Sequence, residues 1–147
     1  MIATGYLLDT VLVSEAVKKA PDPNVAAWIE THDENTLFIS VATLGEIQKG
    51  ISRLHDSKRK EALLAWLAGD VVQRFEGRIL PVDNGVALMW GVLQGEAERG
   101  GAQLPVVDCL IAATASVHNL TVVTRNVRDM QRCGVSVLNP WQLPTEF

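Results

Sequence analysis

The stretch PVVDCLIAATASVHNLTVVT, residues 105–124, decides the fold class of this chain. Its first part is apolar on nearly every side, which predicts a buried helix that begins at Pro105 and ends near His118. Residues 121–124 are rich in β-branched side chains and predict a strand. A buried helix followed by a strand indicates a sheet with helices packed against it.

The same two patterns alternate along the rest of the 147 residues. They predict further strands at residues 6–8, 37–39, 79–82 and 135–138, and helices at residues 11–19, 23–32, 40–54, 57–75, 85–99 and 127–132. Asp22 and Ser40 are placed to cap two of these helices. Because strands separated by helices need crossover connections, the sheet should be mostly parallel. The predicted fold is a three-layer α/β/α arrangement, with residues 1–147 forming a single domain.

The composition is that of a soluble globular protein, with 48% hydrophobic residues, 20% charged residues and a formal net charge of −4. This charge argues against a free-standing nucleic-acid-binding protein with a basic surface. No apolar run approaches the roughly 20 residues that span a bilayer, so we expect a cytoplasmic protein without membrane contact. The two cysteines form no metal-binding motif, and the chain has no glycine-rich nucleotide-binding loop.

Four carboxylates stand out from their surroundings: Asp9, Glu46, Asp108 and Asp129. Asp9 ends the first predicted strand and Asp129 lies just past the strand at residues 121–124, so both belong at the edge where open parallel sheets bind ligands. Asp108 interrupts the buried helix, where a charge needs a cation. Clustered carboxylates repel one another unless a cation balances them. The four acids therefore predict a divalent-metal site, with metal-dependent phosphodiester hydrolysis as the leading hypothesis.

Each acid also has an ordinary structural explanation. Asp9 is placed to cap the following helix, and Asp108 lies in a first helical turn, where exposed N–H groups favour a carboxylate. Asp129 is also suited to a loop or a helix cap. Glu46 falls opposite the apolar stripe of its helix and near Lys49, as a solvated, salt-bridged residue would. That stripe consists of Val41, Leu44, Ile47, Ile51 and Leu54.

Several motifs occur in an order that resembles the PIN domain of VapC-type toxins from type II toxin–antitoxin pairs. They are Leu7-Leu8-Asp9-Thr10, Leu44-Gly45-Glu46-Ile47, the helical segment at residues 107–115 with Asp108, and Thr124-Arg125-Asn126-Val127-Arg128-Asp129. Gly77-Arg78-Ile79-Leu80-Pro81 and Asn139-Pro140-Trp141 are similar to the FitB-like branch of that family. The resemblance runs from Tyr6 to Trp141 and so covers essentially the whole chain.

The resemblance implies an endoribonuclease whose Mg²⁺ or Mn²⁺ is held by the four acids, with inhibition by a cognate VapB-type antitoxin. It also implies a homodimer that binds operator DNA only through the antitoxin. The residues expected to support the acids or to contact the substrate are Thr10, Thr124, Arg125 and Asn126. Arginines beside Asp129 are suited to holding phosphates. Single-stranded or looped RNA is the expected substrate, because its backbone and bases are accessible.

Two departures from the family pattern leave alternatives open. The family usually has Asn after the Asp-Thr pair, where this chain has Val11, and some members place the fourth acid at the position of Asn126 rather than Asp129. Val11 supports a rival hypothesis, a catalytically impaired PIN-like module that still binds an antitoxin. It also excludes a phosphotransferase of the haloacid dehalogenase type, which needs a second Asp there. A DNA-directed nuclease of the flap-endonuclease type is disfavoured by the small size and the missing basic arch.

Overall fold

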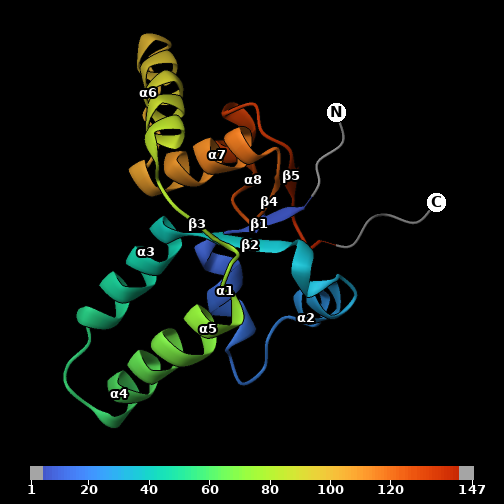
Figure 1. The fold of residues 1–147 in the computed structure, drawn as a ribbon, viewed down its shortest axis with the longest axis vertical. Helices are drawn as coiled ribbons and strands as arrows, with labels where there is room; N and C mark the ends of the chain where they lie inside the picture. The colour runs from blue at the N-terminus through green and yellow to red at the C-terminus, as the bar shows by residue number, and fades with distance from the viewer. Residues whose placement is uncertain (1–4, 143–147) are drawn as a thin grey trace.

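The computed structural model describes residues 5–142 (Figure 1). Its sheet has five parallel strands in the order β3-β2-β1-β4-β5. The strands are β1 (Tyr6–Leu8), β2 (Leu37–Ser40), β3 (Ile79–Leu80), β4 (Thr121–Val123) and β5 (Val137–Leu138). The helices are α1 (Thr10–Ala16), α2 (Pro23–Glu30), α3 (Val41–Ser52), α4 (Lys58–Ala65), α5 (Val72–Arg74), α6 (Asn84–Arg99), α7 (Val106–His118) and α8 (Val127–Arg132). The predicted α/β class with a parallel sheet is confirmed.

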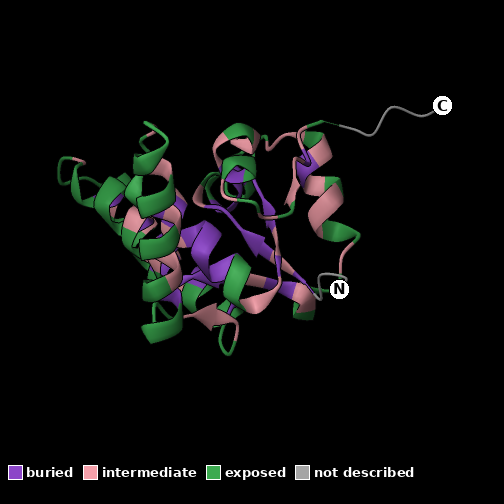
Figure 2. Cartoon of the chain, turned by 90° about the horizontal axis from the view of Figure 1, so that it is seen from above, coloured by how far each residue is buried: buried purple, intermediate pink, exposed green. Residues whose placement is uncertain are grey.

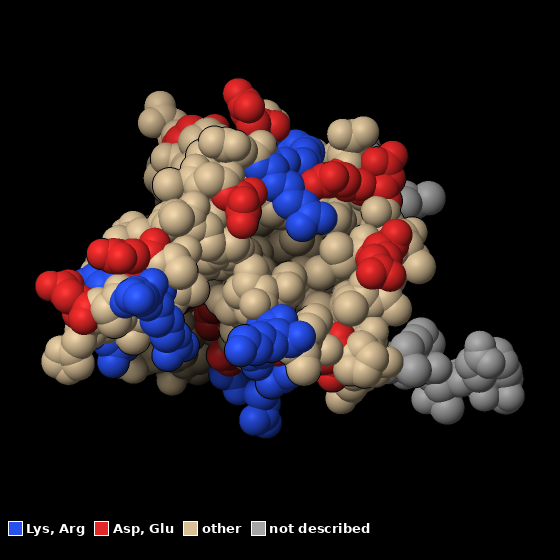
Figure 3. All heavy atoms as spheres, turned by 90° about the horizontal axis from the view of Figure 1, so that it is seen from below, with Lys and Arg blue, Asp and Glu red and all other residues tan. Residues whose placement is uncertain are grey.

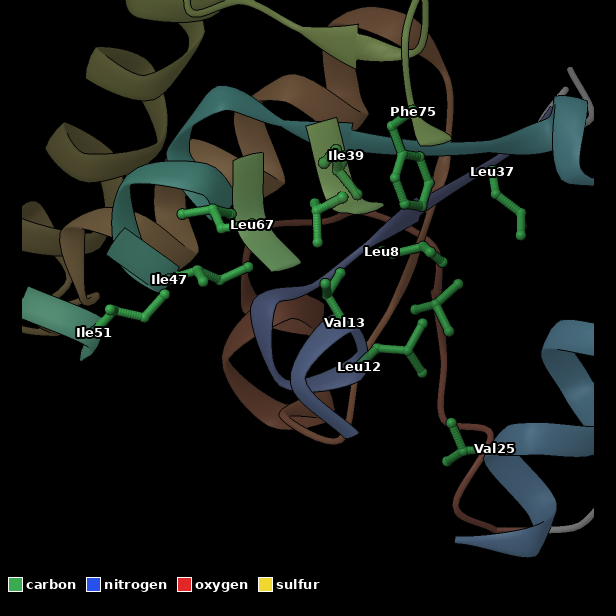
Figure 4. Packing of buried hydrophobic residues seen from close by; sticks show 12 residues of the cluster. Leu8, Leu12, Val13, Val25, Leu37, Ile39, Ile47, Ile51, Leu67 and Phe75 are labelled. Atoms are coloured by element: carbon green, nitrogen blue, oxygen red, sulfur yellow. The ribbon is translucent and has the colours of Figure 1, made fainter. Parts of the chain in front are cut away.

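The core lies on both faces of the sheet. Successive residues of a strand point to opposite faces, so Leu7 packs in one buried cluster with Ile111 of α7, and Leu8 packs in another with Leu12 of α1. In Figure 1, α7 and α8 lie on one side of the sheet and α1 and α5 on the other. Figure 4 shows the second cluster, in which Phe75 and Leu8 fill the space beneath the strands. Buried residues accordingly concentrate in the strands and the helix faces turned toward them (Figure 2).

Side-chain caps set the helix boundaries. The Asp22 carboxylate accepts hydrogen bonds from the N–H groups of Asn24 at 2.8 Å and Val25 at 3.2 Å, and α2 begins with a proline. The Ser40 hydroxyl accepts a hydrogen bond from the Ala42 N–H at 3.0 Å. Helix α7 ends at Asn119, whose φ of 55° places it in the left-handed region. The two caps predicted from the sequence are therefore confirmed.

Three details of the predicted elements are wrong. The helix predicted at residues 57–75 is interrupted by a π-helical turn at Trp66–Val71. The strands predicted at residues 79–82 and 135–138 are shorter, because β3 and β5 are edge strands that each pair with a single neighbour. Val41 is 38% exposed, and Thr43 is buried in its place, because α3 packs against α1 and α7 rather than against the sheet alone. No helix within residues 5–142 has the length and apolar character needed to cross a bilayer.

Candidate functional site

The site is built at the carboxyl edge of the sheet, beginning with Asp9 at the end of β1. Asp9 is 2% exposed, and its main-chain N–H donates to the Val123 carbonyl at 3.0 Å. Its Oδ1 accepts a hydrogen bond from the Thr10 N–H at 2.7 Å, so the carboxylate caps α1. The predicted cap is confirmed. The cap holds the carboxylate in one orientation at the end of a central strand, where a ligand can be reached.

Thr124, at the end of the neighbouring strand β4, is hydrogen-bonded to Asp9. It follows β4 directly, it is fully buried, and its hydroxyl donates to Asp9 Oδ2 at 2.6 Å. The same hydroxyl oxygen accepts a hydrogen bond from the Asn126 N–H at 2.9 Å. Both carboxylate oxygens of Asp9 therefore have a donor, although each oxygen keeps a lone pair for a further contact. Thr124 therefore holds the Asp9 carboxylate through a hydrogen bond.

Asn126 connects this pair to the remaining aspartates. Its side-chain Nδ2 donates to Asp108 Oδ2 at 3.0 Å and to Asp129 Oδ2 at 3.3 Å. Asp108 comes from the first turn of α7 and Asp129 from the first turn of α8. One continuous hydrogen-bond network thus runs from Asp9 through Thr124 and Asn126 to the two other aspartates. Asn126 contacts the acids through its side chain, and Asp129 belongs to the same cluster.

The carboxyl group of Asp108 has a strongly raised pKa. Burial, followed by the negative charges of Asp9, Glu46 and Asp129, raises this pKa from 3.8 to about 6. The Asn126 hydrogen bond acts in the opposite direction. The pKa of Asp9 is also raised, first by burial, with a smaller contribution from Glu46 and with the Thr124 and Thr10 hydrogen bonds opposing it. The structure therefore brings the other three predicted acids within electrostatic reach of Asp108.

Glu46 lies on α3 and is only half-buried, rather than on a fully solvated face. It borders a groove between α1, α3 and α4 that Thr10 also lines. The groove combines an apolar lining with the cationic side chains of Lys18, Lys19 and Arg59. Seen from below, Lys and Arg side chains border a hollowed part of the surface (Figure 3). A partner or substrate that entered this groove would reach the acids from the side of Glu46.

The donor chemistry of the cluster suits a hard divalent cation, because all four side chains are carboxylates. Within the described part of the chain, no three His, Cys, Asp or Glu side chains converge as a complete metal-ligand set. Mg²⁺ does not require one, since it keeps several waters and binds through one or two protein carboxylates. At Asp108, whose pKa is raised by burial and by three neighbouring carboxylates, a bound cation would favour the ionised form. The residues present therefore fit such an ion.

Three residues make contacts that were not predicted from the sequence. The Thr10 hydroxyl, expected near the site, meets the buried Thr43 hydroxyl at 3.4 Å. Glu15 is buried and accepts hydrogen bonds from Lys18 at 2.9 Å and from the Asp22 N–H at 2.9 Å, and these contacts hold its pKa below the usual range. The Arg125 guanidinium lies over the Trp141 ring. Of these pairings, the spacing of three residues between Glu15 and Lys18 is a local pattern that could have indicated the contact, and the others have no such signal.

The fold and the site together define a class: a parallel α/β domain that gathers carboxylates where its central strands end. Comparison with known proteins identifies the family within that class. The PIN domain family matches residues 6–134. The chain is 35% identical over 135 residues to Toxin FitB of Neisseria gonorrhoeae, an alignment that covers 92% of this chain and 97% of that protein. It is 33% identical over 136 residues to VapC ribonuclease Y4jK of Sinorhizobium fredii, with 92% and 97% covered.

Solved structures agree with the sequence comparison. The structure of FitAB bound to an IR36 DNA fragment contains a chain with a TM-score of 0.88 and 32% identity, with 97% of this chain and 99% of that chain covered. FitAcB from Neisseria gonorrhoeae gives a TM-score of 0.87 at 35% identity, with 94% and 99% covered. This chain belongs to the PIN domain family, and the resemblance found in the sequence is confirmed.

Proposed function

We propose that this protein is a metal-dependent endoribonuclease and the toxin of a VapBC-type toxin–antitoxin pair. The observation that carries the proposal is the acidic cluster, in which Asp9, Glu46, Asp108 and Asp129 interact at the carboxyl edge of the sheet. The proposal is further supported by relatives that are named ribonucleases and that align over nearly their whole length. Relatives from toxin–antitoxin systems favour RNA over other phosphodiesters.

In this proposal, Asp9 and Asp108 would hold Mg²⁺ or Mn²⁺ directly. Glu46 and Asp129 would complete the site by binding the ion, by holding its waters or by orienting the water that attacks the phosphate. A bound divalent cation would neutralise the carboxylates and stabilise the charge that develops on the scissile phosphate. Thr124 keeps the buried Asp9 carboxylate in place, and Asn126 bridges the two other aspartates by donating to both. These groups need little rearrangement when an ion arrives, which favours catalysis by a preorganised site.

The expected partner is a VapB-type antitoxin, through which the complex would bind operator DNA. Solved relatives of this chain are FitAB bound to DNA and VapBC2 of Rickettsia felis bound to promoter DNA. The groove between α1, α3 and α4 is suited to an amphipathic antitoxin segment, because it is apolar and carries Lys18, Lys19 and Arg59. We also propose a homodimer, for which Leu88 of α6, 73% exposed, offers apolar surface. Cytoplasmic residence stays a prediction.

The rival hypothesis, an antitoxin-binding module with impaired catalysis, is favoured by one observation. Val11 is 44% exposed next to Asp9, where the family usually has a polar Asn. Expression of the chain without its antitoxin distinguishes the two. The nuclease hypothesis predicts growth arrest that Asp108→Ala abolishes. Normal growth, or arrest that persists in the Asp108→Ala variant, would support the rival.

A purified-protein assay tests the proposed chemistry directly. We expect the protein to cleave RNA in Mg²⁺ or Mn²⁺, and we expect EDTA to stop the reaction. The double variant Asp9→Asn with Asp108→Asn should be inactive, while Asp56→Asn, at a fully exposed carboxylate on another part of the surface, should cleave normally. Cleavage that survives EDTA or the double substitution would overturn the metal-dependent mechanism.

A further inference from the structure

Arg125 occupies a distinctive position between two residues of the acidic network. Thr124 before it donates a hydrogen bond to Asp9, and Asn126 after it contacts Asp108 and Asp129. The Arg125 side chain itself is exposed. Its main chain is therefore anchored between two residues that hydrogen-bond the acids, while its guanidinium lies at the surface within electrostatic reach of Glu15. A cation that extends from this loop is suited to bind an anionic substrate that the acidic cluster acts on.

An aromatic ring holds this guanidinium. Arg125 Cζ lies 4.4 Å from the centroid of the Trp141 ring, close enough for a cation–π contact. Trp141 is itself held at both main-chain groups: its N–H donates to Asn139 Oδ1 at 3.0 Å, and its carbonyl accepts from Asn24 Nδ2 at 3.1 Å. The ring also packs against the buried cluster beneath the sheet. Arg125 therefore rests on a rigid support rather than on a mobile surface.

Within residues 5–142, the guanidinium keeps its hydrogen-bond donors available: none of these residues accepts a hydrogen bond from the Arg125 side chain or forms an ion pair with it. Glu15 lies within electrostatic reach, but its recorded partners are Lys18 and the Asp22 N–H, and it does not pair with Arg125. An arginine whose planar fork is held in place but unpaired is suited to bidentate binding of a phosphate.

We propose that Trp141 is a positioning residue, and that it holds the Arg125 guanidinium as a binding group for an RNA backbone phosphate beside the acidic cluster. This inference rests on the proposed ribonuclease function. Stacking on Trp141 restricts the arginine before the substrate arrives, so less conformational entropy is lost when the phosphate binds. A mobile arginine at the same position would bind the phosphate more weakly.

The test measures binding of a fluorescein-labelled, mixed-sequence, single-stranded RNA to the full chain in the Asp108→Asn background, which avoids cleavage. Arg125→Ala should weaken binding by about tenfold and reduce the slope of log Kd against log salt concentration by about 0.7, as expected for one lost phosphate contact. Trp141→Leu should weaken binding in the same direction. Trp141→Phe should restore most of the affinity, because it keeps an aromatic face.

A double-mutant cycle separates positioning from a merely structural role. If Trp141 acts through the guanidinium, Trp141→Leu has no further effect on RNA affinity once Arg125 is Ala, although it still lowers the thermal midpoint in both backgrounds because the ring packs against the buried cluster. Equal weakening of RNA binding in both backgrounds overturns the inference, as does an Arg125→Ala variant that binds with unchanged affinity and salt slope. A different outcome overturns the proposed function itself: the Asp108→Asn protein binds no RNA, and the wild-type chain cleaves none.

Discussion

Asp108→Asn should stabilise the metal-free protein even though it removes an acid on which the proposed activity depends. Asp108 is half-buried among three other carboxylates, and these surroundings raise its pKa from 3.8 to about 6. At neutral pH, folding therefore moves the ionised Asp108 carboxylate partly out of water and close to other negative charges, which costs free energy. Asparagine has nearly the same shape and keeps an oxygen that accepts from Asn126 Nδ2, so the substitution removes charge with little change in packing.

The size and the pH range of the effect follow from linkage. A folded-state pKa above the unfolded value gives stability that is fully present below pH 3.8 and lost as pH rises through about 6. The shift of roughly two pKa units corresponds to about 3 kcal/mol. Because Asp108 keeps part of its contact with water, which screens its charge, we expect about 1–2 kcal/mol. In a domain of this size, that gain raises the thermal midpoint by roughly 2–8 °C.

Urea unfolding in EDTA at pH 7.5 and pH 4.0 measures this difference. Asp108→Asn should have the higher free energy of unfolding at pH 7.5, and the gap should shrink toward zero at pH 4.0. Asp56→Asn is the control, since that side chain is fully exposed and its ion pair with Lys60 contributes little. Added Mg²⁺ should then stabilise the wild type more than the variant. The reasoning is refuted if Asp108→Asn is no more stable than the wild type at pH 7.5 in EDTA.

Two further substitutions probe the same network, and a third probes the buried carboxylate of Glu15 on α1. Thr124→Val removes the hydroxyl that supports the buried Asp9 carboxylate, so it should cost about 1.5–3 kcal/mol in chemical unfolding, whereas Thr124→Ser should lose much less. Asn126→Asp places another carboxylate against Asp108. Because the added charge repels Asp108, the thermal midpoint of the variant should fall in EDTA and recover in Mg²⁺. A midpoint that does not respond to Mg²⁺ would count against a metal site. Glu15→Gln should lower stability at pH 7 but not in strong acid, because the hydrogen bond from Lys18 lowers the pKa of Glu15; a gap that stays constant with pH would contradict this assignment.

Much of this site was predictable because strand ends share one edge of a parallel sheet. The apolar run before Asp9 and the β-branched run before Thr124 place these residues at strand ends, and the structure pairs the two strands, so that a hydrogen bond forms across 115 positions of sequence. Asp108 was indicated by its charge within an apolar helix. These inferences needed only the strand ends and the cost of burying a charge, whereas the order of the strands came from the structure.

Other features depend on packing that no local pattern encodes. Glu46 lies opposite the apolar stripe expected for its helix, and its proximity to Asp9 follows from how α3 packs against α1 and α7. The contact between Arg125 and Trp141 joins two loops that neither periodicity nor capping rules connect. The π turn at Trp66–Val71 likewise interrupts a sequence whose helical pattern is continuous.

The central claim is that these carboxylates bind the divalent ion with which the protein cleaves RNA. Titration with Mn²⁺, monitored by the electron paramagnetic resonance signal of the free ion, gives occupancy, and RNA cleavage in the same samples gives activity. We expect the cleavage rate of the wild type to rise with bound Mn²⁺, and Asp9→Asn with Asp108→Asn to lose both binding and cleavage. Cleavage at full rate without bound Mn²⁺, or undiminished Mn²⁺ binding in the double variant, would contradict the account.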